Sequence, residues 1–391
     1  MSSELKSMHM GQVTSFFIPN VTLVGQHCSK EIPNRLKALG GKHPLVVTDK
    51  GIVACGILKQ ITDILDAAKV AYTVFDGAVP NPTDKNVEDA TKVYLDNKCD
   101  SLISIGGGSS HDCAKGVGFV AGNGGRIQDY EGVDKSSKPF PPYVAVNTTA
   151  GTGSEMTRFC IITDTARKVK MAIIDWRCTP SVAIDDPVLM MGMPPSLTAA
   201  TGMDALTHAI EGYITKGHCT ISDMFHLEAI KLISENLRGA VQNTPEGREG
   251  MALGQYIAGM GFSNVGLGIV HSMAHGLSAL YDTPHGVACA ILLPVGLEYN
   301  KSVAGERYRA VGKAMGVVGI DEMNDVEAAD ATIAAVKQLG ADVGIPANLH
   351  GILKEEDIQF LAESAFADAC RPGNPRDTSV EEIVELYKSQ L

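Results

Sequence analysis

The chain is predicted to contain an N-terminal α/β domain at residues 1–187, followed by an all-α domain at residues 188–391. Three observations lead to this prediction. Short β-branched runs alternate with helical patterns in the first half, which is typical of βαβ units and a parallel sheet. After Asp186-Pro187 these runs stop, and Ala, Leu, Met, Glu and Gly recur at helical spacing almost to Leu391. The length of 391 residues, 45% of them hydrophobic, also favours two domains over one.

The elements of the first half follow from apolar runs bounded by turn-forming residues. A buried strand is expected at residues 43–48, and further strands are expected at 71–75, 101–105, 143–147 and 182–185. One helix is expected from the end of the first strand to about Ala68, and another from about Asp84 to Asn97. The run from Phe159 to Asp175 predicts a hairpin inserted between these units. An earlier strand-like stretch, Ser15 to Val21, has no obvious partner in its own domain.

The composition argues against several classes of function. A formal net charge of −12, with no cluster of Lys or Arg, argues against nucleic-acid binding. The nine cysteines are scattered without a C-x-x-C pair, which is typical of a reducing compartment where Cys packs as a small hydrophobe. The N-terminus lacks signal-peptide architecture, and every apolar run is interrupted before about eighteen residues. We therefore expect a soluble, cytoplasmic protein that does not bind membranes.

The strongest functional pattern is the run GLGIVHSMAHGLSALYDTPHG. His271 and His275 are four residues apart and share one helical face, and His285 follows just past a Thr-Pro pair that should stop the helix. Asp204 and His208 repeat the four-residue spacing on an earlier helix. Two helices and one turn would therefore surround one divalent cation.

Carboxylate oxygen and imidazole nitrogen donors suit Fe²⁺, Zn²⁺ or Ni²⁺, and an open position would bind a substrate oxygen. The alternative is that these are core histidines held by hydrogen bonds, which would require a separate partner for each ring.

A glycine-rich loop directly follows the third predicted strand and opens a helix. Its residues are Gly106, Gly107, Gly108 and Ser109. Backbone N–H groups and the helix dipole favour a phosphate at such a position. The loop is not the G-x-G-x-x-G fingerprint, because His111 occupies the position of the last glycine. A tight turn without a ligand is therefore the alternative.

A second loop, from Thr148 to Glu155, offers free amides and the hydroxyl groups of residues such as Thr149 and Thr152. Two loops at the carboxyl ends of parallel strands can flank one ligand-binding crevice, so a dinucleotide-binding domain is expected. Asp49 ends the first strand and would accept hydrogen bonds from a ribose diol while repelling a 2′-phosphate, which favours NAD over NADP. Its alternative role is the N-cap of the following helix.

At this point the chain resembles a known family. The strings GGGSSHDCAK, NTTAGTGSE, GMDALTHAIEGYIT, HSMAHGLSALYDTPHGVACAILLP and GNPRD are similar to those of the iron-activated (group III) alcohol dehydrogenases. The similarity runs over nearly the whole chain. It is strongest to the branch that holds lactaldehyde reductases, 1,3-propanediol dehydrogenases and NAD-dependent methanol dehydrogenases.

The resemblance implies a fold like that of dehydroquinate synthase, with a divalent metal ion between the two domains. The implied metal ligands are Asp204, His208, His271 and His285. His275 matches a position associated with proton transfer, and its alternatives are direct ligation or support of a ligand. Iron is the usual ion of the family, although Ni²⁺, Zn²⁺, Mn²⁺ and Co²⁺ also suit these donors.

The resemblance also implies an NAD site and a reaction. The implied nucleotide-binding positions are Asp49, Asn81, Gly108, Ser109, Thr148, Thr149 and Lys170. The reaction would move a hydride reversibly between a small primary alcohol and NAD, giving the aldehyde and NADH, with the metal acidifying the alcohol. A homodimer or larger homo-oligomer is implied as well.

Other enzyme classes explain fewer of these features. A metal-dependent hydrolase would not need Asp49 or the glycine-rich loops, and a non-catalytic metal-binding protein would leave them unexplained. A lyase of the dehydroquinate synthase type should have several Lys and Arg residues beside the metal ligands, and the ligand motifs have none adjacent.

The substrate pocket is expected to be apolar. Alternation along a strand sends Phe159 and Ile161 to the same face, and Phe262 would narrow the pocket from the helical domain. A diol placed against Phe159 would leave one hydroxyl unpaired at a cost of roughly 1 to 3 kcal/mol. Methanol through butanol are therefore expected to be preferred over 1,2-propanediol. The alternatives are a diol or lactaldehyde substrate, and a Phe159 that packs in the hairpin core.

Overall fold

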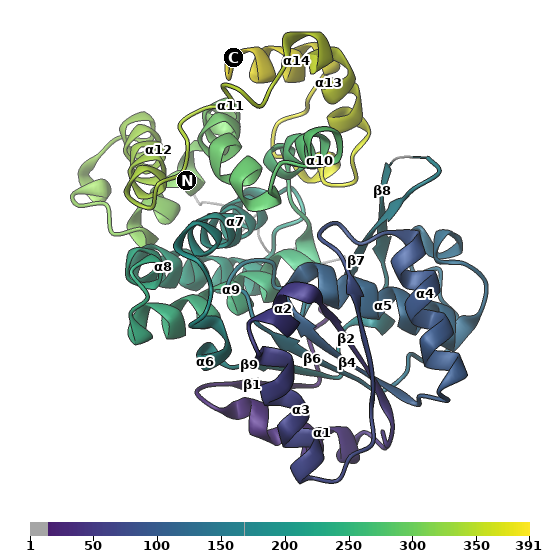
Figure 1. Cartoon of the computed structure of the whole chain (residues 1–391). Helices are drawn as coiled ribbons and strands as arrows, with labels where there is room; N and C mark the ends of the chain where they lie inside the picture. Colours follow the sequence, from purple (N-terminus) through teal and green to yellow (C-terminus); the bar gives the residue numbers. More distant parts are fainter. Residues whose placement is uncertain (1–14, 168) are drawn as a thin grey trace. The chain divides into compact units, whose positions relative to one another are not determined.

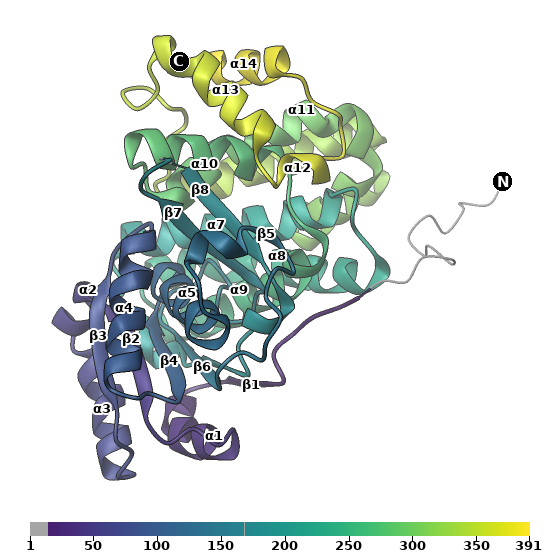
Figure 2. The ribbon, with the colours of Figure 1, turned by 90° about the vertical axis from the view of Figure 1, so that its right-hand side faces the viewer.

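Six parallel strands form one sheet in a computed structural model that describes residues 15–167 and 169–391. Their order in the sheet is β1-β9-β6-β4-β2-β3 (Figure 1; β3 is labelled in Figure 2). The strands are β1 (Val21–Val24), β2 (Pro44–Asp49), β3 (Thr73–Ala78), β4 (Ser101–Gly106), β6 (Tyr143–Asn147) and β9 (Val182–Asp185). Strands β4 and β6 are buried along their whole length, as their continuous apolar sequences predict for a sheet covered on both faces.

The two faces of the sheet are covered by different helices. These are α1 (Ile32–Ala38), α2 (Lys50–Ala54), α3 (Ile57–Ala67), α4 (Asp84–Asp96) and α5 (Gly108–Asn123). Val46 of β2 packs in a core with Leu36 of α1 and Ile61 of α3. Its neighbour Val47 packs on the other face with the core residues of α4 and α5. This alternation is the period-two pattern of a strand buried on both sides.

Two expectations for this region are corrected. The single helix predicted up to Ala68 is two helices, because Gly56 adopts a left-handed conformation with φ +81° between α2 and α3. The stretch Ser15 to Val21 is not an unpaired strand. Strand β1 begins at Val21 and pairs in parallel with β9 of the same sheet, and residues 15–20 are not in a strand.

The predicted hairpin consists of β7 (Phe159–Asp164) and β8 (Val169–Ile174), which pair antiparallel. Strand β5 (Gly132–Val133) extends it to a three-stranded sheet (Figure 2). Cys160 and Ile162 point into a buried cluster, whereas Phe159 and Ile161 lie on the less buried face. The alternation along β7 therefore keeps Phe159 out of the hairpin core.

Only helices occur among the described residues after β9. They are α6 (Pro187–Met190), α7 (Pro195–Ile214), α8 (Thr220–Val241), α9 (Pro245–Val265), α10 (Ile269–Tyr281), α11 (His285–Ala314), α12 (Asp325–Asp342), α13 (Ile358–Ala367) and α14 (Val380–Lys388), with short 3₁₀ turns between some of them. Helix α7 packs against α8, α9 and α11 and is buried from Gly202 to its end. No helix among the described residues is both long and apolar enough to span a bilayer.

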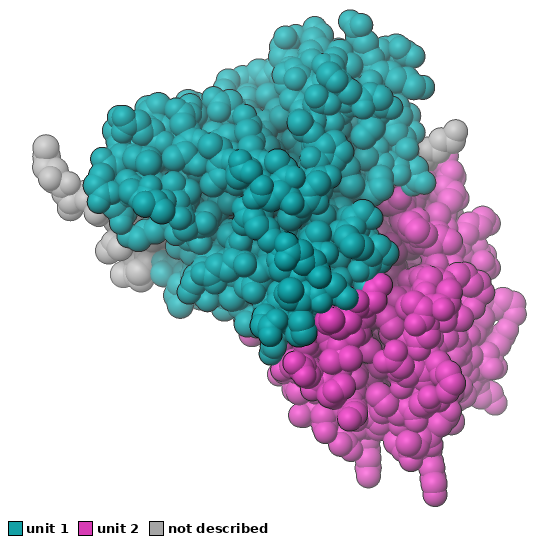
Figure 3. All heavy atoms as spheres, turned by 60° about the vertical axis from the view of Figure 1, so that its left-hand side comes forward, with its two compact units in different colours: residues 1–16, 193–391 teal, residues 17–192 magenta. Residues whose placement is uncertain are grey.

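The chain divides into two compact units, which Figure 3 distinguishes by colour. Residues 17–192 form the α/β unit, and residues 193–391 form the helical unit together with Ser15 and Phe16. The division by contacts lies between Gly192 and Met193, close to the change in sequence texture at Pro187.

Candidate metal centre and nucleotide loops

Three helices of the helical unit carry the expected metal ligands. Asp204 and His208 lie one turn apart on α7, and His271 lies on α10. His285 is the first residue of α11, so the expectation that it lies in a turn is wrong. Because Pro284 precedes it, the chain ends one helix and starts the next within a few residues.

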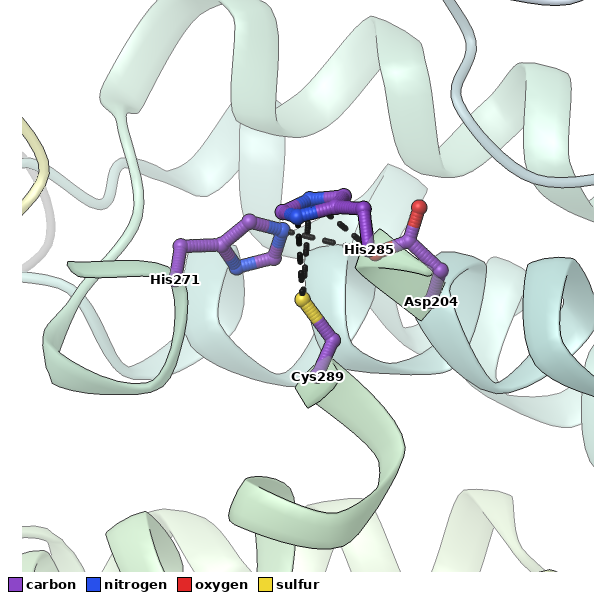
Figure 4. Close-up of side chains that lie close together, drawn as sticks. All are labelled: Asp204, His271, His285 and Cys289. Atoms are coloured by element: carbon purple, nitrogen blue, oxygen red, sulfur yellow. Dashed lines mark hydrogen bonds and ion pairs between the residues drawn. The ribbon is translucent and has the colours of Figure 1, made fainter. Parts of the chain in front are cut away.

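The donor atoms of Asp204, His271 and His285 converge, as Figure 4 shows. Oδ1 of Asp204 lies 3.6 Å from Nε2 of His271 and 3.7 Å from Nε2 of His285. Asp204 and His271 are buried, yet Asp204 Oδ1 and His271 Nε2 have no hydrogen-bond partner among the described residues. Buried polar atoms without partners are costly, and a divalent cation between them would satisfy both. These residues therefore fit a metal ion.

The charge state of Asp204 suits this role. Burial alone would raise its pKa, but the charges of His208, His285 and His271 hold the pKa well below its usual value. The carboxylate is therefore available as an anionic ligand at neutral pH.

His208 stands beside this group of converging atoms. Its ring stacks on the ring of His271, with centroids 4.5 Å apart, and on that of Phe262, with centroids 4.2 Å apart. The donor atoms that lie within 4.8 Å of one another belong to Asp204, His271, His285 and Cys289. The sulfur atom of Cys289 thus lies among the oxygen and nitrogen donors that the sequence predicts.

Glu211 orients His271, and the sequence reasoning missed it. Oε2 of Glu211 lies 2.6 Å from Nδ1 of His271, and the same carboxylate accepts the backbone N–H groups of Val270 and His271. A carboxylate there accepts a hydrogen bond from Nδ1–H and leaves the Nε2 lone pair for a metal. The signal in the sequence is its position seven residues after Asp204, which puts both on one face of α7.

Small residues allow the three helices to approach closely. A Cβ atom on Gly286 would lie 2.4 Å from the carbonyl oxygen of Ala200, so the start of α11 packs against α7 only with glycine there. A Cβ atom on Gly268 would lie 2.8 Å from Oε1 of Glu211. These contacts place His285 near Asp204 and the start of α10 near Glu211.

His275 lies next to the ligand cluster and has a partner of its own. Its ring stacks on that of His285 at 5.3 Å, and its Nδ1 lies 2.8 Å from Oδ2 of Asp368 at the end of α13. Burial would raise the pKa of Asp368, but the charge and hydrogen bond of His275 hold it below the usual value. An ionised Asp368 can only accept, so Nδ1 of His275 donates and Nε2 is left as the proton acceptor.

The glycine-rich loop of the α/β unit lies where the strand order reverses. The chain passes from β2 to β3 on one side and then to β4 on the other, so the carboxyl ends of β2 and β4 are neighbours. Open α/β sheets bind ligands at such a switch point. Gly106 ends β4, Gly107 is the N-cap of α5, and Gly108 and Ser109 begin that helix.

The two expected nucleotide loops lie against each other. A Cβ atom on Gly107 would lie 2.9 Å from the side chain of Thr149, and one on Gly108 would lie 3.1 Å from that of Thr152. No side chain caps the start of α5, and the buried hydroxyl of Thr148 has no hydrogen-bond partner among the described residues. A phosphate-bearing dinucleotide fits a helix start whose first N–H groups are not bonded by a capping side chain.

Three expected nucleotide residues remain, namely Asp49, Asn81 and Lys170. Asp49 caps α2 by accepting the Ile52 N–H at 3.0 Å, and its other oxygen accepts the Ser110 hydroxyl at 3.1 Å. Asn81 accepts a hydrogen bond from Nζ of Lys170 at 2.9 Å, across a separation of 89 residues. Asp49 therefore acts as the helix cap. Because it also lies beside the glycine-rich loop, its carboxylate is in a position that suits hydrogen bonding to the ribose of a dinucleotide.

Lys115 fixes the segment that leads into Phe159. Its fully buried ammonium group on α5 donates to the carbonyl oxygens of Ser154 and Phe159, each at 2.7 Å, and lies 3.3 Å from the Thr157 hydroxyl. These bonds satisfy a buried charge and hold the start of β7 in place. Phe159 and Ile161 then occupy the half-buried face of that strand.

Comparisons with known proteins match both units. The protein-family model described as iron-containing alcohol dehydrogenase matches residues 19–187. A second family model, described as the C-terminal part of the Fe-containing alcohol dehydrogenase family, matches residues 198–391. The lactaldehyde reductase of Escherichia coli (strain K12) is 47% identical over 359 residues, which cover 91% of this chain and 94% of that protein.

Two further relatives extend over more of the chain. The NAD-dependent methanol dehydrogenase of Bacillus methanolicus is 43% identical over 97% of this chain and 100% of its own. A crystal structure of 1,3-propanediol oxidoreductase superposes with a TM-score of 0.94 at 43% identity, over 97% of this chain and 100% of that chain. The chain therefore belongs to the iron-containing alcohol dehydrogenase family and is a metal-dependent alcohol dehydrogenase that uses NAD.

Proposed function

We propose that this enzyme oxidises small unbranched primary alcohols, methanol to butanol, to their aldehydes with NAD, and catalyses the reverse reduction. The observation that supports a dehydrogenase site most strongly is that the donor atoms of Asp204, His271 and His285 converge. Two of these atoms, Asp204 Oδ1 and His271 Nε2, are buried without a hydrogen-bond partner among the described residues. The proposed ion is Fe²⁺, held by these three residues and His208. When bound, the ion supplies Lewis-acid chemistry at an alcohol or carbonyl oxygen, and NAD accepts or returns the hydride.

His275 is proposed to move the proton. Asp368 holds Nδ1 of His275, so the unprotonated Nε2 takes the proton that the alcohol loses on oxidation and returns it on reduction. The ring of His275 is held in place by its stack on His285 and its hydrogen bond to Asp368. A fixed ring of this kind is what positioned proton transfer requires.

The α/β unit is proposed to bind NAD through its two loops. The N–H groups at the start of α5 would hold the pyrophosphate, with Thr148, Thr149 and Thr152 beside it. Asp49 would accept the ribose hydroxyls, and the Asn81–Lys170 pair would contact the nucleotide as well. The positive end of α5 and the hydroxyl of Thr148 support this assignment.

Three apolar side chains support a preference for unbranched alcohols. Phe159 and Ile161 share the face of β7 that is not committed to the hairpin core, and Phe262 lies against the His208 ring. None of these side chains can bond a second hydroxyl. The second candidate substrate is a diol or lactaldehyde, which is favoured by the 47% identity to a lactaldehyde reductase.

We also propose that the enzyme is a homodimer or larger. Strand β1 is one edge of the six-stranded sheet, and edge strands offer unpaired backbone groups to a second copy.

The test combines metal analysis with a substrate panel. Purified protein should contain about one divalent ion per chain, with iron predominant, and NAD-linked oxidation should be measured for methanol to butanol and for 1,2- and 1,3-propanediol. The proposal expects the highest kcat/KM among the monohydric alcohols. Higher kcat/KM for a diol would favour the second candidate, and the absence of NAD-linked oxidation with every alcohol would contradict both.

A further inference from the structure

Cys289 presents its sulfur to the metal-ligand cluster. It lies four residues after His285 on α11, so both side chains extend from the same face of that helix. The Cys289 Sγ atom lies 3.6 Å from Nε2 and 4.0 Å from Nδ1 of His285, and the side chain is fully buried. Figure 4 shows Sγ directed toward the two imidazole rings.

The spacing of the donor atoms matches a tetrahedral site with one sulfur. With Zn–S of about 2.3 Å and Zn–N of about 2.0 Å, neighbouring ligand atoms in such a site lie about 3.3 to 3.6 Å apart. The Sγ–Nε2 distance of 3.6 Å and the two carboxylate–imidazole distances of 3.6 and 3.7 Å are close to these values. The remaining donor pairs lie within 4.8 Å of one another, so the cluster would close around an ion to form a four-donor site.

The surroundings of Cys289 differ from those of the other buried cysteines. Cys99, Cys113, Cys160 and Cys178 belong to hydrophobic core clusters of the α/β unit. Cys289 instead has polar donor atoms as its neighbours, and two of these, Asp204 Oδ1 and His271 Nε2, are buried without a hydrogen-bond partner among the described residues. These two unsatisfied atoms indicate that a cation binds between them, and the Cys289 sulfur is directed toward the same position.

We propose that Cys289 is a metal ligand when the site holds a thiophilic ion, Zn²⁺ or Co²⁺, and completes a four-donor set with Asp204, His271 and His285. This inference rests on the metal site of the proposed function. Coordination releases the thiol proton to solvent, and the resulting thiolate favours soft and borderline ions over Mn²⁺. The site of this chain is therefore more selective for Zn²⁺ and Co²⁺ than a site of oxygen and nitrogen donors alone.

The experiment uses the full-length protein, freed of metal with a chelator and loaded with Co²⁺ without oxygen. A thiolate bound to Co²⁺ gives a charge-transfer absorption band in the near ultraviolet. We expect this band in the unsubstituted protein and in Cys113→Ala, and its loss in Cys289→Ala and Cys289→Ser. Circular dichroism and thermal unfolding would show that each variant is folded, and the serine variant nearly preserves the volume of the thiol.

Competition with a chelator supplies a second readout. Loss of Cys289 should weaken Zn²⁺ and Co²⁺ binding about tenfold or more while changing Mn²⁺ affinity by less than about threefold. If both variants fail to fold, X-ray absorption at the zinc edge of the unsubstituted protein still decides the matter, because it shows either one sulfur neighbour or none.

Cys370 provides the matched alternative, since its thiol lies with His275 and Asp368 in the adjacent group. A band that disappears in Cys370→Ala but persists in Cys289→Ala overturns the proposal. Binding of Co²⁺ or Zn²⁺ without a sulfur neighbour also overturns it, although the dehydrogenase proposal would stand. Failure to bind any divalent ion would contradict both.

Discussion

Nδ1 of His271 lies 2.6 Å from Oε2 of Glu211, and both residues are almost fully buried. The same carboxylate accepts two backbone N–H groups in the first turn of α10, so it fixes the helix and the ring together. A charged acceptor at a helix N-terminus is also favoured by the helix dipole. The orientation of one proposed metal ligand thus depends on a carboxylate from a different helix, α7.

Replacing Glu211 should weaken the metal site. In Glu211→Gln the charge is lost and the His271 tautomer is less firmly held, so metal affinity should fall about 10- to 100-fold with little change in helix content. Chelator competition measures the affinity, and circular dichroism measures the helix content. Glu235→Gln, on an exposed position of α8, is the control. Equal metal affinities in the two variants would show that Glu211 only caps α10.

Asp368 should act as a positioning residue for His275. Asp368→Asn removes the charge that stabilises a protonated ring, so kcat should fall about tenfold or more while KM changes by less than about threefold. Steady-state kinetics with one alcohol and NAD measures both constants. Asp330→Asn, an exposed change on α12, is the control. A proportional rise in KM without a change in kcat would argue for a role in substrate binding.

The same variant should alter how stability depends on pH. The pKa of Asp368 is lowered in the folded protein, so its contribution to stability is present above the unfolded pKa of about 3.9 and is lost as the pH falls further. The free energy of unfolding should therefore differ most between the metal-free forms of wild type and Asp368→Asn near pH 7, and converge near pH 3. Urea unfolding at both pH values gives the comparison, and a gap that widens at low pH would contradict it.

Asp49 should exclude NADPH. Asp49→Asn keeps an N-cap for α2 but removes the charge, so the preference for NADP relative to NAD should improve by at least about tenfold, or about 1.4 kcal/mol. The ratio of kcat/KM for the two cofactors measures it. Asp49→Gly should give the same change in preference with a slightly less stable protein. Asp63→Asn, an exposed change on α3, controls for net charge. If the ratio of kcat/KM for NADP and NAD is unchanged in both Asp49 variants, the Asp49 carboxylate has only its capping role.

Phe159 should set the preference for alcohols over diols. Phe159→Asn introduces a group that can bond a second hydroxyl, so kcat/KM for 1,2-propanediol relative to 1-propanol should rise by about 5- to 150-fold, equivalent to about 1 to 3 kcal/mol. Val169→Asn, on the neighbouring strand of the hairpin, is the control. A ratio that stays constant in Phe159→Asn, or a wild-type preference for the diol, would remove Phe159 from the pocket.

The enzyme should sediment as a homodimer or a larger assembly at micromolar concentration. The exposed edge of β1 provides one surface for a second copy. Analytical ultracentrifugation over a range of concentrations measures the mass, and a single species at 41.3 kDa throughout would contradict the expectation.

The sequence predicted most of the sheet, because buried parallel strands require continuous apolar runs and these are visible along the chain. Strands β6 and β9 have the expected bounds, Tyr143–Asn147 and Val182–Asp185. It did not predict the break at Gly56 or the pairing of β1 with β9. Both depend on contacts or backbone conformation that hydrophobic periodicity does not report.

For the site, the sequence by itself determined the chemistry of the donors and the helical faces that carry them. Asp204 with His208, and His271 with His275, share faces because of their four-residue spacing. Only the tertiary structure decided which atoms from different helices meet. Glu211 reaches His271 across 60 residues and Asp368 reaches His275 across 93, and Cys289 joins the donors because α11 packs against both α7 and α10. Periodicity fixes directions within one helix, but the packing of side chains between helices fixes the distances on which metal binding and proton transfer depend.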